Sequence, residues 1–77
     1  MITRNTIINE YFERNCSSNY ITLEDLVKSK KMSKKELIDF CKKECIFYHH
    51  GFTKEQIQDR VIDNISRIVY TMICCKN

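Results

Sequence analysis

The stretch that most constrains this 77-residue chain is residues 21–45, because it holds two helix starts only eleven residues apart. Each start has the pattern of a capping box. The hydroxyls of Thr22 and Ser33 can accept from a free N–H of the first helical turn, and a carboxylate three residues later can accept from the cap residue's own N–H. That carboxylate is Glu36 in the second box and the shorter Asp25 in the first, so the first box is predicted to be weaker.

Apolar residues bracket both caps as hydrophobic staples, in the pairs Ile21 with Leu26 and Met32 with Leu37. Two caps this close leave room for a first helix of about two turns, over residues 22–30. A second helix over residues 33–45 then follows a short corner. The pattern predicts a helical hairpin over about residues 22–45.

A third capping box, Thr53 to Gln56, opens the longest predicted helix, over residues 53–74. Its apolar stripe is broader than one short helix can cover, and comprises Ile57, Val61, Ile62, Ile65, Ile68, Val69, Met72 and Ile73. This helix is therefore either the central helix of a bundle or a seam between two copies of the chain. The residues that fit an alternating seam, and are the candidate dimer or partner interface, are Ile62, Ile65, Val69 and Met72.

Residues 3–15 have the apolar spacing of a first helix, which Thr3 or Asn5 can cap. The chain has no proline and one glycine, so it lacks most of the turn-forming residues that usually connect the strands of β-hairpins. We therefore expect an all-α fold, a small four-helix domain spanning residues 1–77. Gly51 is expected to supply a positive φ at a turn, and Phe47 or Tyr48 to fold back on the core together with Phe52.

A two-turn helix, a short corner and a longer helix resemble the helix-turn-helix of DNA-binding regulators over residues 21–45, about a third of the chain. Leu26, Met32, Leu37 and Phe40 fall where that motif buries its contacts. The departures from its usual pattern are Val27 in place of Ala or Gly, Lys30 in place of an apolar residue, and Lys31 in place of the turn glycine.

The resemblance implies that the second helix is a recognition helix, with Lys34 and Lys35 reaching the major groove of DNA. Phosphate contacts would then come from Lys28, Lys30, Lys31, Lys42 and Lys43. Seven of the nine lysines lie between residues 28 and 43, although the formal net charge is only +3. The alternative interpretation is a solvated helix face, and the carboxylates of Glu36 and Asp39 on the same helix favour it.

The sequence has five cysteines and no apparent signal peptide, which predicts reduced thiols in the cytoplasm, or in the nucleus of a eukaryote or its virus. It has no run of about 20 apolar residues, which predicts no membrane span. Heavy use of Ile, Asn and Lys is typical of AT-rich coding sequence, as in viruses and mobile elements. Cys41, Cys45 and His49 are spaced by four, and Cys74 or Cys75 could complete a zinc site. The spacing is not that of a standard finger, so we expect no metal and no other cofactor.

No nucleophile in the sequence is accompanied by a glycine-rich turn or an acidic orienting residue, so an enzyme is not expected. Two functions remain. The leading hypothesis is a small non-enzymatic regulator that binds DNA through residues 22–45. The alternative is a helical protein-binding module, such as an inhibitor or adaptor from a virus or mobile element, that uses the apolar face of its C-terminal helix.

Overall fold

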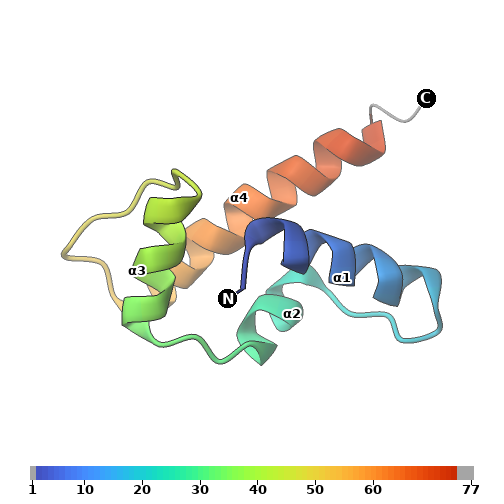
Figure 1. Cartoon of the computed structure of the whole chain (residues 1–77), viewed down its shortest axis with the longest axis horizontal. Helices are drawn as coiled ribbons and strands as arrows, with labels where there is room; N and C mark the ends of the chain where they lie inside the picture. Colours follow the sequence, from blue (N-terminus) through green and yellow to red (C-terminus); the bar gives the residue numbers. More distant parts are fainter. Residues whose placement is uncertain (1, 75–77) are drawn as a thin grey trace.

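The computed structural model describes residues 2–74 and is all-helical, with no strand in that range (Figure 1). Its four helices are α1 (Arg4–Cys16), α2 (Leu23–Ser29), α3 (Lys34–Lys43) and α4 (Lys54–Cys74). The predicted all-α class and the long C-terminal helix are confirmed. At 1.5 Å per residue the 21 residues of α4 extend about 31 Å, and so set most of the 39 Å long dimension of the molecule.

Side-chain caps begin the helices where the sequence predicts. Thr3, not Asn5, caps α1 by accepting from the N–H of Thr6 at 3.2 Å. In the third box the Thr53 N–H donates to the Gln56 side chain at 2.8 Å, and the Gln56 N–H donates to the Thr53 hydroxyl at 3.2 Å. These bonds satisfy backbone donors that the first helical turn leaves without a partner.

The boxes of α2 and α3 differ as the lengths of their acidic side chains predict. At α3 both bonds form: the Ser33 N–H donates to the Glu36 carboxylate at 3.0 Å, and the Glu36 N–H donates to the Ser33 hydroxyl at 3.2 Å. At α2 the Thr22 hydroxyl accepts from the N–H of Asp25 at 3.2 Å, and no return bond to the Asp25 carboxylate forms among the described residues. The first box is thus the weaker one.

The Glu36 box makes stability depend on pH. The Ser33 N–H, then the Ser33 hydroxyl and the Lys54 charge, hold the pKa of the Glu36 carboxyl below its usual 4.5. A depressed folded-state pKa contributes stability above pH 4.5, which is lost as the pH falls through the folded pKa. Glu36→Gln keeps an acceptor but does not titrate. Urea unfolding should therefore show a stability advantage of the wild type over Glu36→Gln that shrinks between about pH 6 and pH 3; a constant difference would contradict the prediction.

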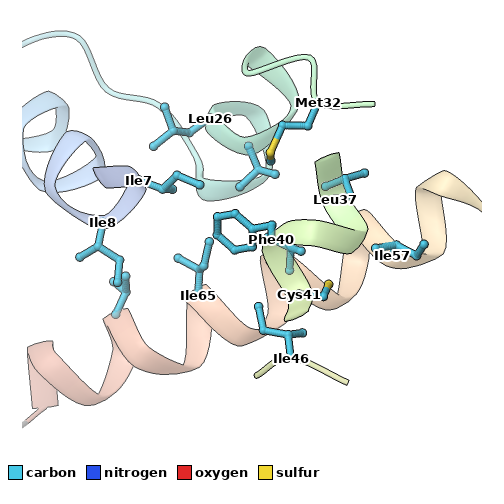
Figure 2. Packing of buried hydrophobic residues seen from close by; sticks show 13 residues of the cluster. Ile7, Ile8, Leu26, Met32, Leu37, Phe40, Cys41, Ile46, Ile57 and Ile65 are labelled. Carbon is cyan, nitrogen blue, oxygen red and sulfur yellow. The ribbon is translucent and has the colours of Figure 1, made fainter. Parts of the chain in front are cut away.

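The core joins all four helices, and α4 is its central element. α4 packs against α3, α2 and α1, and α1 also packs against α2. Figure 2 shows side chains from every helix meeting above α4. The buried cluster consists of Ile7, Ile8, Leu26, Val27, Met32, Leu37, Phe40, Cys41, Ile46, Ile57, Val61, Ile65 and Val69. Tyr48 and Phe52 are partly buried against it, whereas Phe47 turns outward.

Within residues 2–74 the chain reverses at two residues with positive φ, and neither is the glycine. Lys31 (φ 52°) follows α2, and Cys45 (φ 58°) follows α3. After α3 the N–H of Ile46 returns to the Cys41 carbonyl at 2.8 Å, as in a Schellman ending. The expected positive φ at Gly51 is wrong. The Gly51 N–H donates to Nδ1 of the exposed His49 side chain at 2.9 Å, and a Cβ at residue 51 would lie 3.2 Å from that nitrogen, so a larger residue there would need a small shift of the His49 ring.

A part-buried polar network fastens the start of α1 to two other elements. The Glu44 carboxylate, just after α3, accepts from the N–H of Arg4 at 3.0 Å, and the Arg4 guanidinium donates to Asn64 of α4 at 3.0 Å. Glu44 thus supplies the negative charge that the first turn of α1 lacks. None of the helices within residues 2–74 has the length and apolar character needed to cross a membrane.

Candidate nucleic-acid interface

The corner between α2 and α3 is sharp, and its geometry begins with Lys31. Backbone N–H groups of Lys30 and Lys31 close the end of α2 on the carbonyls of Val27 and Lys28 at 3.2 and 3.1 Å. Lys31 then takes the left-handed conformation that favours glycine, at the position where a helix-turn-helix usually has one. The chain therefore bends here instead of continuing as a single helix.

Contacts with α4 bring α2 and α3 together. Leu26 of α2, Met32 of the corner, and Leu37 and Phe40 of α3 are all buried, and Figure 2 shows them converging above α4. Among residues 2–74, α2 and α3 each pack against α4 and not against each other. The hairpin is thus held by a third helix, while its outer side stays open to solvent.

Six of the seven candidate lysines are exposed to solvent. They are Lys28, Lys31, Lys34, Lys35, Lys42 and Lys43. Lys28 pairs with Glu24 on its own helix at 3.9 Å, an exposed pair of small energetic value. Within the described chain, the ammonium groups of Lys31, Lys34, Lys35 and Lys42 have no carboxylate partner. These four cations are therefore available to an anionic partner.

Lys30 is the exception, and its predicted phosphate contact needs correction. Its side chain is only 20% exposed and its ammonium group binds the Glu10 carboxylate of α1. Most of the Lys30 side chain is shielded from solvent, and Glu10 neutralises its charge locally. Lys30 joins α2 to α1 and is not part of the open cationic surface.

Lys34 and Lys35 occupy the first two positions of α3, where the positive end of the helix dipole disfavours cations. Lys42 and Lys43 lie in the last turn, where the dipole stabilises a positive charge. The helix dipole alone can therefore account for lysine at residues 42 and 43. It cannot account for Lys34 and Lys35, which makes these two the more informative candidates for binding.

Carboxylates limit the cationic surface on one side of α3. A small hollow of about 130 Å³ is lined by Ile2, Met32, Glu36, Asp39, Phe40 and Lys43. Typical small-molecule sites have volumes of roughly 300–1,000 Å³, so the hollow does not suggest a ligand site of that kind. The Glu36 and Asp39 carboxylates therefore add negative charge on the side of α3 that holds Lys43.

The candidate interface residues of α4 are distributed between core and surface. Ile65 and Val69 are buried in the chain's own core, Ile62 is half-buried, and Met72 is 47% exposed. The last turns of α4 run beyond the bundle (Figure 1). Their exposed large hydrophobic side chains are Tyr70, Met72 and Ile73. An apolar contact through α4 would therefore use the end of the helix.

The cysteines and histidines are dispersed. Because α3 ends at Lys43, Cys41, Cys45 and His49 do not share one helical face. No cluster of three or more His, Cys, Asp or Glu that could hold a metal forms within residues 2–74, and Cys75 lies outside that range. Burial raises the pKa of the Cys41 thiol, so Cys41 is a small apolar core residue.

A scan against protein-family models and searches of curated proteins and of solved structures find no match to this chain.

One exposed group was missed by the sequence reasoning. Arg60 of α4 lies over the rings of Phe47 and Phe52, with its guanidinium carbon 5.6 Å from each ring centroid. The heptad and capping patterns do not connect Arg60 with residues eight and thirteen positions earlier. The aromatic residues on either side of Gly51 predicted that Phe47 or Tyr48, and Phe52, pack on the core, and gave no sign of a cationic neighbour.

Proposed function

We propose that this protein is a small non-enzymatic DNA-binding regulator that contacts duplex DNA with α3 and the corner before it. Lys34 and Lys35 would enter the major groove at the N-terminal end of α3, the end that recognition helices direct toward base edges. Lys28, Lys31, Lys42 and Lys43 would contact phosphates. Lys30 is left out because Glu10 neutralises it.

The observation that carries this proposal is the pair of exposed lysines at the start of α3. Each opposes the local helix dipole, at a cost of about 0.3–1 kcal/mol. Neither is offset by a carboxylate partner within the described chain. A solvated face would be served equally well by Glu or Gln at these positions. An anionic ligand provides a reason for lysine.

The test is a titration of fluorescently labelled mixed-sequence duplex DNA at two salt concentrations. If the four lysines assigned to phosphates make their contacts, affinity should fall roughly 10²-fold between 50 and 200 mM salt, because each contact releases condensed counterions. A single-stranded oligonucleotide of the same length serves as the control. Absence of duplex binding at 50 mM salt, or binding insensitive to salt, would refute the proposal.

A second candidate function, a protein-binding module or homodimer, is favoured by the end of α4. Met72 is 47% and Ile73 is 53% exposed, although both continue the apolar side of a helix whose earlier turns are buried. Light-scattering mass is measured on the same sample as the duplex titration. A dimeric mass that becomes monomeric in Ile73→Glu would support the contact through α4, and if duplex binding is also absent the lysines only solubilise the protein.

A further inference from the structure

The segment between α3 and α4 presents an aromatic surface that is independent of the lysine face. Its base is Ile46, which is buried in the core, while the next residue, Phe47, is 66% exposed. The Phe47 ring meets the Phe52 ring edge to face, with centroids 6.3 Å apart. Phe52 is itself partly buried against the core, so the exposed ring stands on a fixed support.

Arg60 of α4 completes this surface. Its guanidinium carbon lies 5.6 Å from the centroids of both Phe47 and Phe52. No carboxylate within residues 2–74 pairs with it. Two aromatic neighbours restrict the orientation of the guanidinium plane, so less freedom is lost when its N–H groups bind an acceptor. A planar carboxylate can take two parallel hydrogen bonds from such a group.

A shallow hollow lies beside the guanidinium. It has a volume of about 270 Å³ and is lined by Phe52, Gln56, Asp59 and Arg60. Small-molecule sites are usually larger, roughly 300–1,000 Å³. The hollow therefore suits one or two side chains of a larger partner. Its charges are of both signs, because Asp59 adjoins Arg60 and has no basic partner among the described residues.

We propose that Phe47, Phe52 and Arg60 form a docking site for a peptide segment of a partner protein that carries a carboxylate next to an apolar side chain. The carboxylate would bind the Arg60 guanidinium and the apolar side chain would pack on Phe47. A peptide N–H or a basic side chain would match Asp59. Aromatic residues and arginine at the centre of an interface are the residue types that contribute most of the binding free energy between proteins.

The charges favour a peptide over a nucleic acid at this site. A nucleic-acid strand carries a negative charge at every nucleotide and would bring phosphates against both Asp59 and the exposed Glu55. A peptide can place one carboxylate at Arg60 and neutral or positive groups beside Asp59. The proposal does not depend on DNA binding by α3, since none of the candidate lysines contributes to the surface.

The experiment is selection of a displayed library of random twelve-residue peptides on the immobilised full chain, followed by titration of a synthetic selected peptide. Enriched sequences should share an acidic residue flanked by an apolar one. Both Arg60→Lys, which keeps the charge but loses the planar fork, and Phe47→Ala should weaken the peptide by about 10- to 30-fold. Arg67→Lys is the matched control, because Arg67 lies two turns further along α4 and pairs with Asp63 at 3.1 Å.

Three results would overturn the proposal: no enrichment, enriched peptides without an acidic residue, or equal affinity for wild type and Arg60→Lys. Binding of an oligothymidylate that is lost in Phe47→Ala would also overturn it, because the rings would then stack on nucleobases. Both substituted side chains are exposed, so circular dichroism should give wild-type melting for each variant. Amide chemical-shift changes with the bound peptide should be confined to residues 46–60.

Discussion

Ile65→Ala should leave the chain largely unfolded at 25 °C. Ile65 is fully buried near the middle of α4, the helix on which the other three pack, and Figure 2 shows it rising from α4 into the core. Truncating a buried isoleucine to alanine costs about 2–5 kcal/mol, from lost burial and from the cavity that remains. A 77-residue domain has only about 3–5 kcal/mol of net stability, so one such cavity removes most of it.

Urea unfolding followed by circular dichroism at 222 nm would measure this loss. The matched control is Ile73→Ala, the same truncation on the same helix at a residue that is 53% exposed. Alanine has the higher helix propensity, so the control should change stability by less than about 0.5 kcal/mol. Equal stability of Ile65→Ala and wild type would mean that α4 is not the centre of this core.

The burial of Ile65 also decides how a partner role for α4 can be tested. A glutamate at Ile65 or Val69 would be placed in the apolar core, and loss of a complex would then follow from unfolding. Substitutions at Met72 or Ile73 do not have this drawback because both side chains are exposed. Only the end of α4 can separate a partner contact from stability.

The sequence was sufficient to predict the helices because their starts are encoded locally. Ser33 and Thr53 act within three residues of themselves, and the staple residues Met32 and Leu37 are buried as the pattern requires. Four helices with few breakers between them can bury their apolar stripes only against one another. The breadth of the stripe on α4 left two alternatives open, a central helix or a seam between two copies, and within the chain α4 packs against the other three helices.

Features that depend on contacts distant in sequence were not predictable in this way. In the sequence, nothing distinguishes Lys30 from the other lysines of its cluster. Only the fold shows that it pairs with Glu10, twenty residues earlier. Glu44 and Arg4 are forty residues apart. The left-handed conformation was expected at Gly51, but Lys31 and Cys45 adopt it because helix ends require it there. Conformational propensity alone favours glycine for a positive φ, but the positions of the helix ends determine which residues adopt it.

The proposed function predicts that the double variant Lys34→Glu, Lys35→Glu loses duplex binding by at least about 100-fold, from two lost contacts of about 1–3 kcal/mol each and the repulsion that replaces them. Folding should not suffer. The substitutions place carboxylates in the first turn of α3, where the helix dipole favours them, so the melting temperature should equal or exceed that of the wild type.

The charge-matched control is the double variant Arg14→Glu, Arg67→Glu, which changes the net charge of the chain by the same amount. Arg14 lies near the end of α1 and Arg67 in the half of α4 away from α3 (Figure 1). If affinity depended only on total charge, both double variants would lose it equally. A loss confined to Lys34→Glu, Lys35→Glu would locate the contact at the start of α3. Unchanged binding in that variant would remove the groove assignment, because no other exposed lysine pair opposes the dipole of α3.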